Sequence, residues 1–214
     1  MDKRIKKALI YDMDNTLFPV SDIGPELFRP LFDRIEASGS YSAQMDNIKK
    51  DLMRKPFQEV AKTYDFDNQL IHDGDKILSE LTYEKEIKLF EDYPAILELP
   101  GERFLVTTGY KKMQQSKINS MGVSKDFKDI IVVDPSISNL TKKDVFAQIM
   151  SINGFLPNDM LVIGDDPDSE IKAAKELGIE TVLYNKLELT DQPYADFIIK
   201  DFRELAPILL RQTP

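Results

Sequence analysis

Short apolar runs alternate with segments of helical periodicity along most of this chain, and this alternation restricts its fold more than any other feature. Four nearly continuous apolar runs, at residues 8–11, 104–106, 129–133 and 160–163, have the length of strands, and two further short ones follow at 181–183 and 196–199. Between them, apolar residues recur three or four positions apart, as on one face of a helix. Continuous apolar strands alternating with helices form a parallel sheet covered on both faces. We therefore predict an α/β fold with a doubly wound, Rossmann-like sheet.

Size and composition exclude several classes of protein. The chain has 214 residues, of which 42% are hydrophobic, which is enough for one domain or for one domain with an insertion. Its net charge of −9 argues against a nucleic-acid-binding surface, which needs a basic patch. The absence of cysteine excludes disulfides and thiolate catalysis. Without an apolar stretch long enough for a membrane span or signal peptide, we expect a cytoplasmic protein, either monomeric or homodimeric.

A long helical region interrupts the alternation after the first strand. From about Pro25 to Phe90 the apolar residues keep helical spacing, as in Leu27, Leu31 and Ile35, and no strand pattern intervenes. We expect four or five helices here, forming an all-helical cap domain over residues 19–91, with residues 1–18 and 92–214 forming the core. The single histidine, His72, lies in this region, where we expect a surface or packing role.

Two carboxylates follow the first strand, at Asp12 and Asp14. Side chains two residues apart share one side of an extended chain, so both can project together if the extended path continues. Neighbouring carboxylates repel, and a proton or a metal ion must relieve the repulsion. Mg²⁺ binds carboxylate oxygens together with phosphate oxygens of a substrate. A solvated Asp-x-Asp turn would explain this pair alone, without any site.

Further polar residues follow the other strands. In parallel sheets ligands bind beyond the carboxyl ends of the strands, which places Thr107, Asp165 and Glu170 beside the first pair. Lys142, at the start of a helix, can join them. Several carboxylates with a hydroxyl and a lysine suit Mg²⁺ and phosphate better than packing, because the metal and the ammonium can neutralise a phosphoryl group.

The motifs resemble those of the haloacid dehalogenase superfamily of phosphatases. Asp12-Met13-Asp14-Asn15-Thr16 is similar to the family's Asp-x-Asp-x-Thr motif, and the strand ending in Thr107-Thr108-Gly109 resembles its second motif. The run from Gly164 to Glu170 is similar to its last motif, and the helical insertion lies where the family's small cap domain lies. The resemblance covers essentially the whole chain, with the first and last motifs the most specific.

The resemblance implies a role for each matching residue. Asp12 would be the nucleophile and Asp14 the general acid/base, in a reaction that passes through an aspartyl-phosphate. Mg²⁺ would be held by Asp12, the backbone carbonyl of Asp14, and Asp165, with Glu170 as a supporting acid. The phosphoryl group would be bound by Thr107, the adjacent Thr108, and Lys142.

Some alternatives stay open at this point. Lys143 rivals Lys142 as the phosphate lysine, and Asp166 or Asp168 could share the role of Glu170. The resemblance implies a phosphatase acting on a small phosphorylated metabolite of the nucleotide, phosphoglycolate or sugar phosphate class. A phosphomutase of the same superfamily, a catalytically silent phosphate-binding member and a signalling receiver domain are the other candidates.

Overall fold

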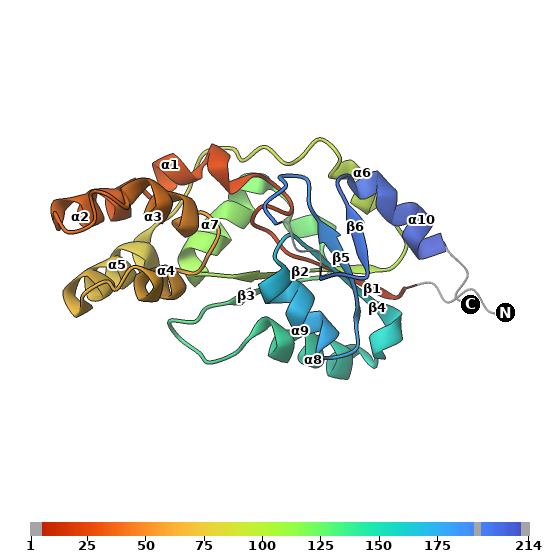
Figure 1. Cartoon of the computed structure of the whole chain (residues 1–214). Helices are drawn as coiled ribbons and strands as arrows, with labels where there is room; N and C mark the ends of the chain where they lie inside the picture. Colours follow the sequence, from red (N-terminus) through yellow and green to blue (C-terminus); the bar gives the residue numbers. More distant parts are fainter. Residues whose placement is uncertain (1–5, 191–193, 211–214) are drawn as a thin grey trace.

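The computed structural model describes residues 6–190 and 194–210, and its centre is a parallel sheet of six strands (Figure 1). Their order across the sheet is β3-β2-β1-β4-β5-β6, so β1 lies between β2 and β4. All six predicted strands are confirmed: β1 (Ala8–Tyr11), β2 (Glu102–Thr108), β3 (Asp129–Val133), β4 (Met160–Gly164), β5 (Glu180–Tyr184) and β6 (Phe197–Ile199).

Helices cover both faces of this sheet. One face carries α6 (Pro94–Leu97), α7 (Lys111–Met121) and α10 (Leu205–Leu210), and the other carries α8 (Lys142–Asn153) and α9 (Lys172–Lys175) (Figure 1). Side chains alternate along β1, so Leu9 and Tyr11 join the first core whereas Ala8 and Ile10 join the second. The doubly wound α/β class predicted from the sequence is therefore confirmed.

The helix boundaries follow local signals in the sequence. Helix α7 ends at Gly122, whose φ of 69° is the left-handed conformation that glycine adopts without strain. Helix α8 begins after Thr141, whose hydroxyl accepts the N–H of Asp144 while the Asp144 carboxylate accepts from the Thr141 backbone. These caps matter for function because the first residue of α8 is Lys142.

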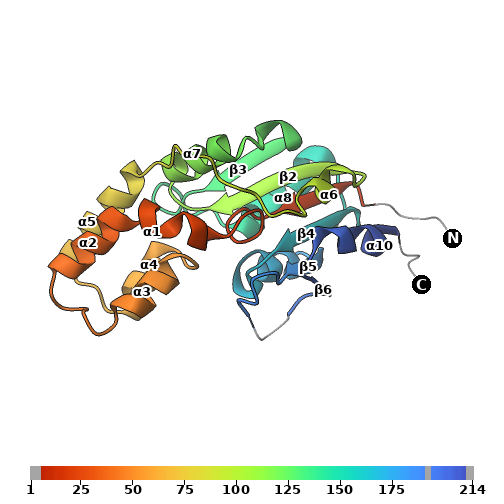
Figure 2. The same cartoon turned by 90° about the horizontal axis from the view of Figure 1, so that it is seen from above.

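The helical insertion forms a separate group beyond the carboxyl ends of the strands (Figures 1 and 2). We call its helices α1–α5 the cap. They are α1 (Gly24–Leu27), α2 (Arg29–Ala37), α3 (Met45–Leu52), α4 (Phe57–Thr63) and α5 (Asn68–Glu80). His72 is exposed on α5. The domain boundaries at residues 18/19 and 91/92 stay a prediction.

The prediction of helix as far as Phe90 is wrong. Helix α5 ends at Glu80, and residues 81–93 contain no helix. This connection runs beside α7, where the N–H of Tyr83 donates to Ser116 Oγ at 2.8 Å and the N–H of Ile87 donates to the Ser120 carbonyl at 3.2 Å. These bonds from outside satisfy part of the segment's backbone in place of helical hydrogen bonds.

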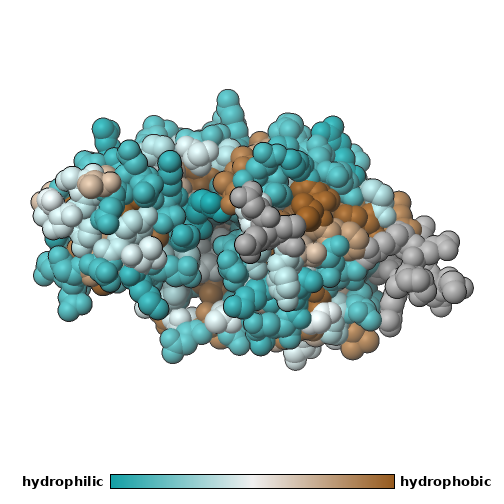
Figure 3. Space-filling model, viewed as in Figure 1, coloured by the Kyte–Doolittle hydropathy of each residue, from teal (hydrophilic) through white to brown (hydrophobic). Residues whose placement is uncertain are grey.

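The surface agrees with a chain of high charge. Hydrophilic side chains dominate the face drawn in Figure 3, and hydrophobic ones gather mainly near β6 and α10. Among the described residues, no helix combines the length and the apolar character that crossing a membrane requires.

Candidate active site

The order of the strands points to one place for a site. From β1 the chain proceeds to β2 and β3 on one side, and then returns past β1 to β4, β5 and β6 on the other. In open α/β sheets ligands bind beyond the carboxyl ends of the strands at such a reversal. A cavity of about 600 Å³ lies there, lined by the ends of β1, β2 and β4 and by cap residues that include Arg54, Lys55 and Gln58.

Asp12 continues the line of β1 into this cavity. Its N–H donates to the Ile163 carbonyl at 2.9 Å, which prolongs the pairing of β1 with β4 by one residue. The residue is 7% exposed. Burial raises the pKa of the Asp12 carboxyl to about 7, although the nearby Lys142 ammonium opposes this rise.

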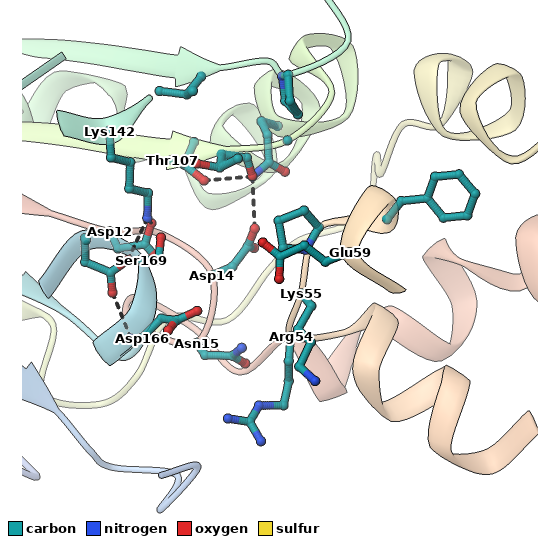
Figure 4. A pocket seen from close by; sticks show the side chains of 18 of the residues that line it. Asp12, Asp14, Asn15, Arg54, Lys55, Glu59, Thr107, Lys142, Asp166 and Ser169 are labelled. Atoms are coloured by element: carbon teal, nitrogen blue, oxygen red, sulfur yellow. Dashed lines mark hydrogen bonds and ion pairs between the residues drawn. The ribbon is translucent and has the colours of Figure 1, made fainter. Parts of the chain in front are cut away.

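Lys142 provides the cation beside Asp12 (Figure 4). Its Nζ lies 2.6 Å from Asp12 Oδ1 and 2.8 Å from Glu170 Oε2. Burial by itself would lower the pKa of Lys142, but the two carboxylates outweigh it and raise this pKa above its usual value. Lys143 is half-buried at the rim of the cavity, and its Nζ pairs with Glu176 at 2.8 Å. Of the two candidate lysines, the structure therefore brings Lys142 to Asp12.

Three carboxylates meet at the end of β4. Asp12, Asp165 and Glu170 each offer an oxygen, and these oxygens lie within 4.8 Å of one another. Burial, followed by the charges of Glu170 and Asp12, raises the pKa of Asp165 well above its usual value. Hard oxygen ligands at this spacing fit Mg²⁺, which would relieve their mutual repulsion. The residues present thus suit the expected metal.

Glu170 enters this group because Gly164 leaves room for it. A Cβ added to Gly164 would lie 2.1 Å from Glu170 Oε1. The same oxygen accepts the N–H of Asp166 at 2.8 Å. Asp166 in turn accepts the N–H of Asp168 at 2.8 Å, and Asp168 is exposed. Neither of these two rivals of Glu170 belongs to the three-carboxylate group.

Asp14 lines the same cavity but turns toward α7. Lys117 Nζ lies 2.6 Å from its Oδ1 and 2.7 Å from its Oδ2. Gln114 Nε2 donates to Asp14 Oδ2 at 2.9 Å. Asp12 and Asp14 thus share the cavity, as expected, while their cations come from helices on opposite faces of the sheet.

The two threonines at the end of β2 differ in burial. Thr107 is 1% exposed, and its Oγ1 accepts a hydrogen bond from Gln114 Nε2 at 2.7 Å (Figure 4). Thr108 is half-buried, and its carbonyl accepts from the same nitrogen at 3.0 Å. Both line the cavity.

Sequence reasoning missed Gln114 and Lys117. Both are buried although they are polar, and they are three positions apart, so they share one face of α7. That spacing after Thr107 is the signal that could have drawn attention to them.

Tyr110 joins the cap to the core at the edge of the cavity. Its hydroxyl donates to Asp75 of α5 and accepts from Gln58 of α4 at 3.1 Å. Asn15, with a φ of 59°, turns the chain out of the first motif, and its Oδ1 accepts the N–H of Val20 at 3.0 Å. These contacts set the position of the cap above the acids.

Comparison with known proteins agrees with this arrangement. The model of the haloacid dehalogenase-like hydrolase family matches residues 9–184. The chain is 24% identical to a glyceraldehyde 3-phosphate phosphatase of Methanopyrus kandleri, over 92% of this chain and 91% of that one. It is also 24% identical to a protein of the same name from Methanocaldococcus jannaschii, over 95% of this chain and 96% of that one.

Solved structures show the same fold. The putative HAD-hydrolase YfnB of Bacillus subtilis, bound to magnesium, superimposes with a TM-score of 0.66 at 19% identity, over 96% of this chain and 99% of that one. A HAD phosphatase of Thermococcus onnurineus also gives 0.66, at 20% identity, over 95% of this chain and 97% of that one. Since the family model matches far more than half of the sequence, this chain belongs to the haloacid dehalogenase-like hydrolases.

Proposed function

We propose that this hydrolase is a Mg²⁺-dependent phosphatase of small phosphomonoesters that works through an aspartyl-phosphate on Asp12. The observation that carries the proposal is the position of the Asp12 carboxylate, which is buried next to Lys142 within a group of three acids. Asp14 supplies the second carboxylate that a phosphatase needs, and dehalogenases of the family lack both this residue and the metal-binding acids.

Each residue has a defined task in the proposed reaction. An Asp12 oxygen attacks phosphorus and the bond to the leaving oxygen breaks, while Asp14 gives that oxygen a proton. Water then attacks the phosphorus of the aspartyl-phosphate and gives its proton to Asp14, and phosphate leaves with the Asp12 carboxylate restored. Lys142 and Thr107 bind the phosphoryl oxygens throughout.

Asp12, Asp165 and the backbone carbonyl of Asp14 would hold the metal, supported by Glu170. Bound Mg²⁺ neutralises phosphoryl charge and orients the group for in-line attack. The magnesium-bound relative of the same fold supports this assignment.

The substrate is a small phosphorylated metabolite in this proposal. A cavity of about 600 Å³ that is roofed by the cap suits such a molecule. The curated relatives named glyceraldehyde 3-phosphate phosphatase make three-carbon phosphates the first group to assay.

The test is Mg²⁺-dependent release of phosphate from an aryl phosphate and from a panel of three-carbon phosphates. Loss of a covalent nucleophile costs a factor of up to about 10⁶, so Asp12→Asn should abolish turnover. Asp33→Asn, an exposed aspartate of α2, is the matched control and should keep wild-type activity. Activity that survives in Asp12→Asn, or that persists after Mg²⁺ has been removed with a chelator, would refute the proposal.

A further inference from the structure

Two buried polar residues of α7 contact the acid that the proposed reaction uses as its proton donor. Lys117 is 2% exposed and its ammonium holds both oxygens of Asp14, at 2.6 and 2.7 Å. Gln114, 1% exposed, adds a third hydrogen bond to the same carboxylate at 2.9 Å. The Asp14 side chain itself is 27% exposed and lines the cavity. Three hydrogen bonds from two donor groups of one helix therefore fix a carboxylate that faces the cavity.

Burying a lysine is expensive unless a partner repays the lost hydration. Lys117 lies with its ammonium 5.9 Å from the centre of the Phe18 ring, in the apolar layer between α7 and the sheet. A neutral residue would fill this place in the core at lower cost. The ion pair with Asp14 offsets the lost hydration of Lys117 and so accounts for a lysine at this buried position.

Gln114 connects Asp14 to Thr107 through a single nitrogen. Its Nε2 donates to Thr107 Oγ1 at 2.7 Å as well as to Asp14 Oδ2. Since the Thr107 oxygen accepts from Gln114, its own hydroxyl proton stays available for a phosphoryl oxygen. Gly109 makes room for this arrangement, because a Cβ there would lie 3.0 Å from the Gln114 amide carbon.

We propose that Lys117 and Gln114 are positioning residues, which hold the Asp14 carboxyl group and the Thr107 hydroxyl in the orientation that phosphoryl transfer needs. The inference rests on the proposed phosphatase function. In Figure 4 Asp14 lies between Asp12 and Glu59 of the cap, on the path by which a leaving group would extend from the phosphorus toward the cap. To act as the donor, Asp14 takes up a proton on one oxygen in place of one Lys117 contact, and the remaining contacts hold the carboxyl group. Small displacements of Asp14 would move this proton away from the leaving oxygen.

A purely structural role for the Lys117–Asp14 ion pair predicts something different. If the pair only joined α7 to the first motif, its loss would lower the activity toward every substrate by the same factor. A positioning role affects proton donation, so the loss depends on how much the leaving group needs a proton. Phenyl phosphate and 4-nitrophenyl phosphate are matched in shape and differ in this need, since 4-nitrophenolate leaves readily without protonation.

The experiment compares kcat/KM for these two substrates, because kcat/KM reports the steps through formation of the aspartyl-phosphate. In Lys117→Met and in Gln114→Leu we expect kcat/KM for phenyl phosphate to fall by about 10²-fold, the usual contribution of a placed acid, and that for 4-nitrophenyl phosphate by less than about 10-fold. Lys117→Arg keeps the charge and should recover most of the loss. Lys125→Met and Gln115→Leu, both at exposed positions, should match the wild type.

Equal losses for both substrates, or unchanged values, would overturn the proposal. A second measurement does not need turnover: in the crystal structure of Lys117→Met the Asp14 carboxylate should leave its wild-type position while Asp12 stays in place. An unmoved Asp14 would also overturn it. Absence of turnover in the wild type, by contrast, would refute the phosphatase function, and the crystal structures alone would then test whether Lys117 and Gln114 hold Asp14 in position.

Discussion

Burial of Asp12 makes the stability of the metal-free protein depend on pH in the direction opposite to that of salt-bridged surface carboxylates. The residue is 7% exposed, and burial raises its pKa from the ordinary 3.8 to about 7, with the charge of Glu170 adding to the rise and that of Lys142 opposing it. Asp12→Asn removes the titrating group and keeps the shape of the side chain. The comparison of the two proteins across pH therefore reports the titration of this carboxyl together with its effect on the neighbouring carboxyl of Asp165.

The direction of this pH dependence follows from the number of protons that the folded and unfolded states bind. In the unfolded chain the carboxyl ionises near 3.8, whereas in the folded protein it keeps its proton until about pH 7. The folded state thus binds more protons between these values, so the stabilisation is fully present below the ordinary pKa and is lost as the pH rises through 7. This difference between the pKa of Asp12 in the folded and unfolded states corresponds to at most about 4 kcal/mol in the free energy of unfolding.

The assay is guanidinium unfolding in the presence of a chelator, from about pH 4 to about pH 8, with the free energy of unfolding fitted at each pH. Asp12→Asn should become more stable relative to wild type as the pH rises, by up to about 4 kcal/mol, and the difference should level off above about pH 7. Asp33→Asn should differ from wild type by a constant amount. A flat difference for Asp12→Asn would show that Asp12 ionises in the folded protein as it does in water, and the argument from burial would fail.

Three further predictions test the surroundings of the acids. Gly164→Ala would place a Cβ 2.1 Å from Glu170 Oε1 and so displace that carboxylate, and calorimetry should find weaker Mg²⁺ binding; unchanged affinity would place Glu170 outside the metal site. Lys142→Met leaves two buried carboxylates without their cation and should cost about 3–5 kcal/mol in unfolding experiments, whereas Lys143→Met should have no measurable effect; equal effects would contradict the assignment. Tyr110→Phe removes both hydrogen bonds by which this hydroxyl joins the cap to the core, so hydrogen exchange in α4 and α5 should become faster by about tenfold or more, since each bond contributes about 1 kcal/mol; unchanged exchange would mean that other contacts hold the cap.

The sheet, and the edge of it at which the site lies, could be predicted because the sequence patterns that mark them are local. Each buried strand is a continuous apolar run, and each run ends at a polar residue that the topology rule carries to the same edge. Asp12, Thr107 and Asp165 follow from these two facts alone. The caps at Thr141 and Gly122 are equally local, which is why the start of α8, and with it Lys142, could be placed from the sequence.

The connection after α5 shows where periodicity misleads. Tyr83, Ile87 and Phe90 are buried and are three or four positions apart, as on a helix, yet their backbone is not helical. Their side chains join the main apolar core, while serines of α7 satisfy part of the backbone. The spacing of buried residues reports which side chains meet the core and does not by itself report how the backbone is bonded.

Which lysine bonds to which acid was beyond sequence reasoning, because it depends on where individual side chains from different layers point: Lys117 of α7 bonds to Asp14 and Lys142 of α8 bonds to Asp12. The two lysines also come from opposite layers, since α7 and α8 cover different faces of the sheet. Asp12 thereby lies buried with Glu170 around the single ammonium of Lys142, as the proposed mechanism requires of a nucleophile that must be held still. Asp14 is held from the other layer and is partly open to the cavity, as the proposed exchange of protons with a leaving group or with water requires. Two aspartates only two residues apart acquire different environments because helices from both faces of the sheet reach the end of β1, and a doubly wound sheet provides this at its central strand.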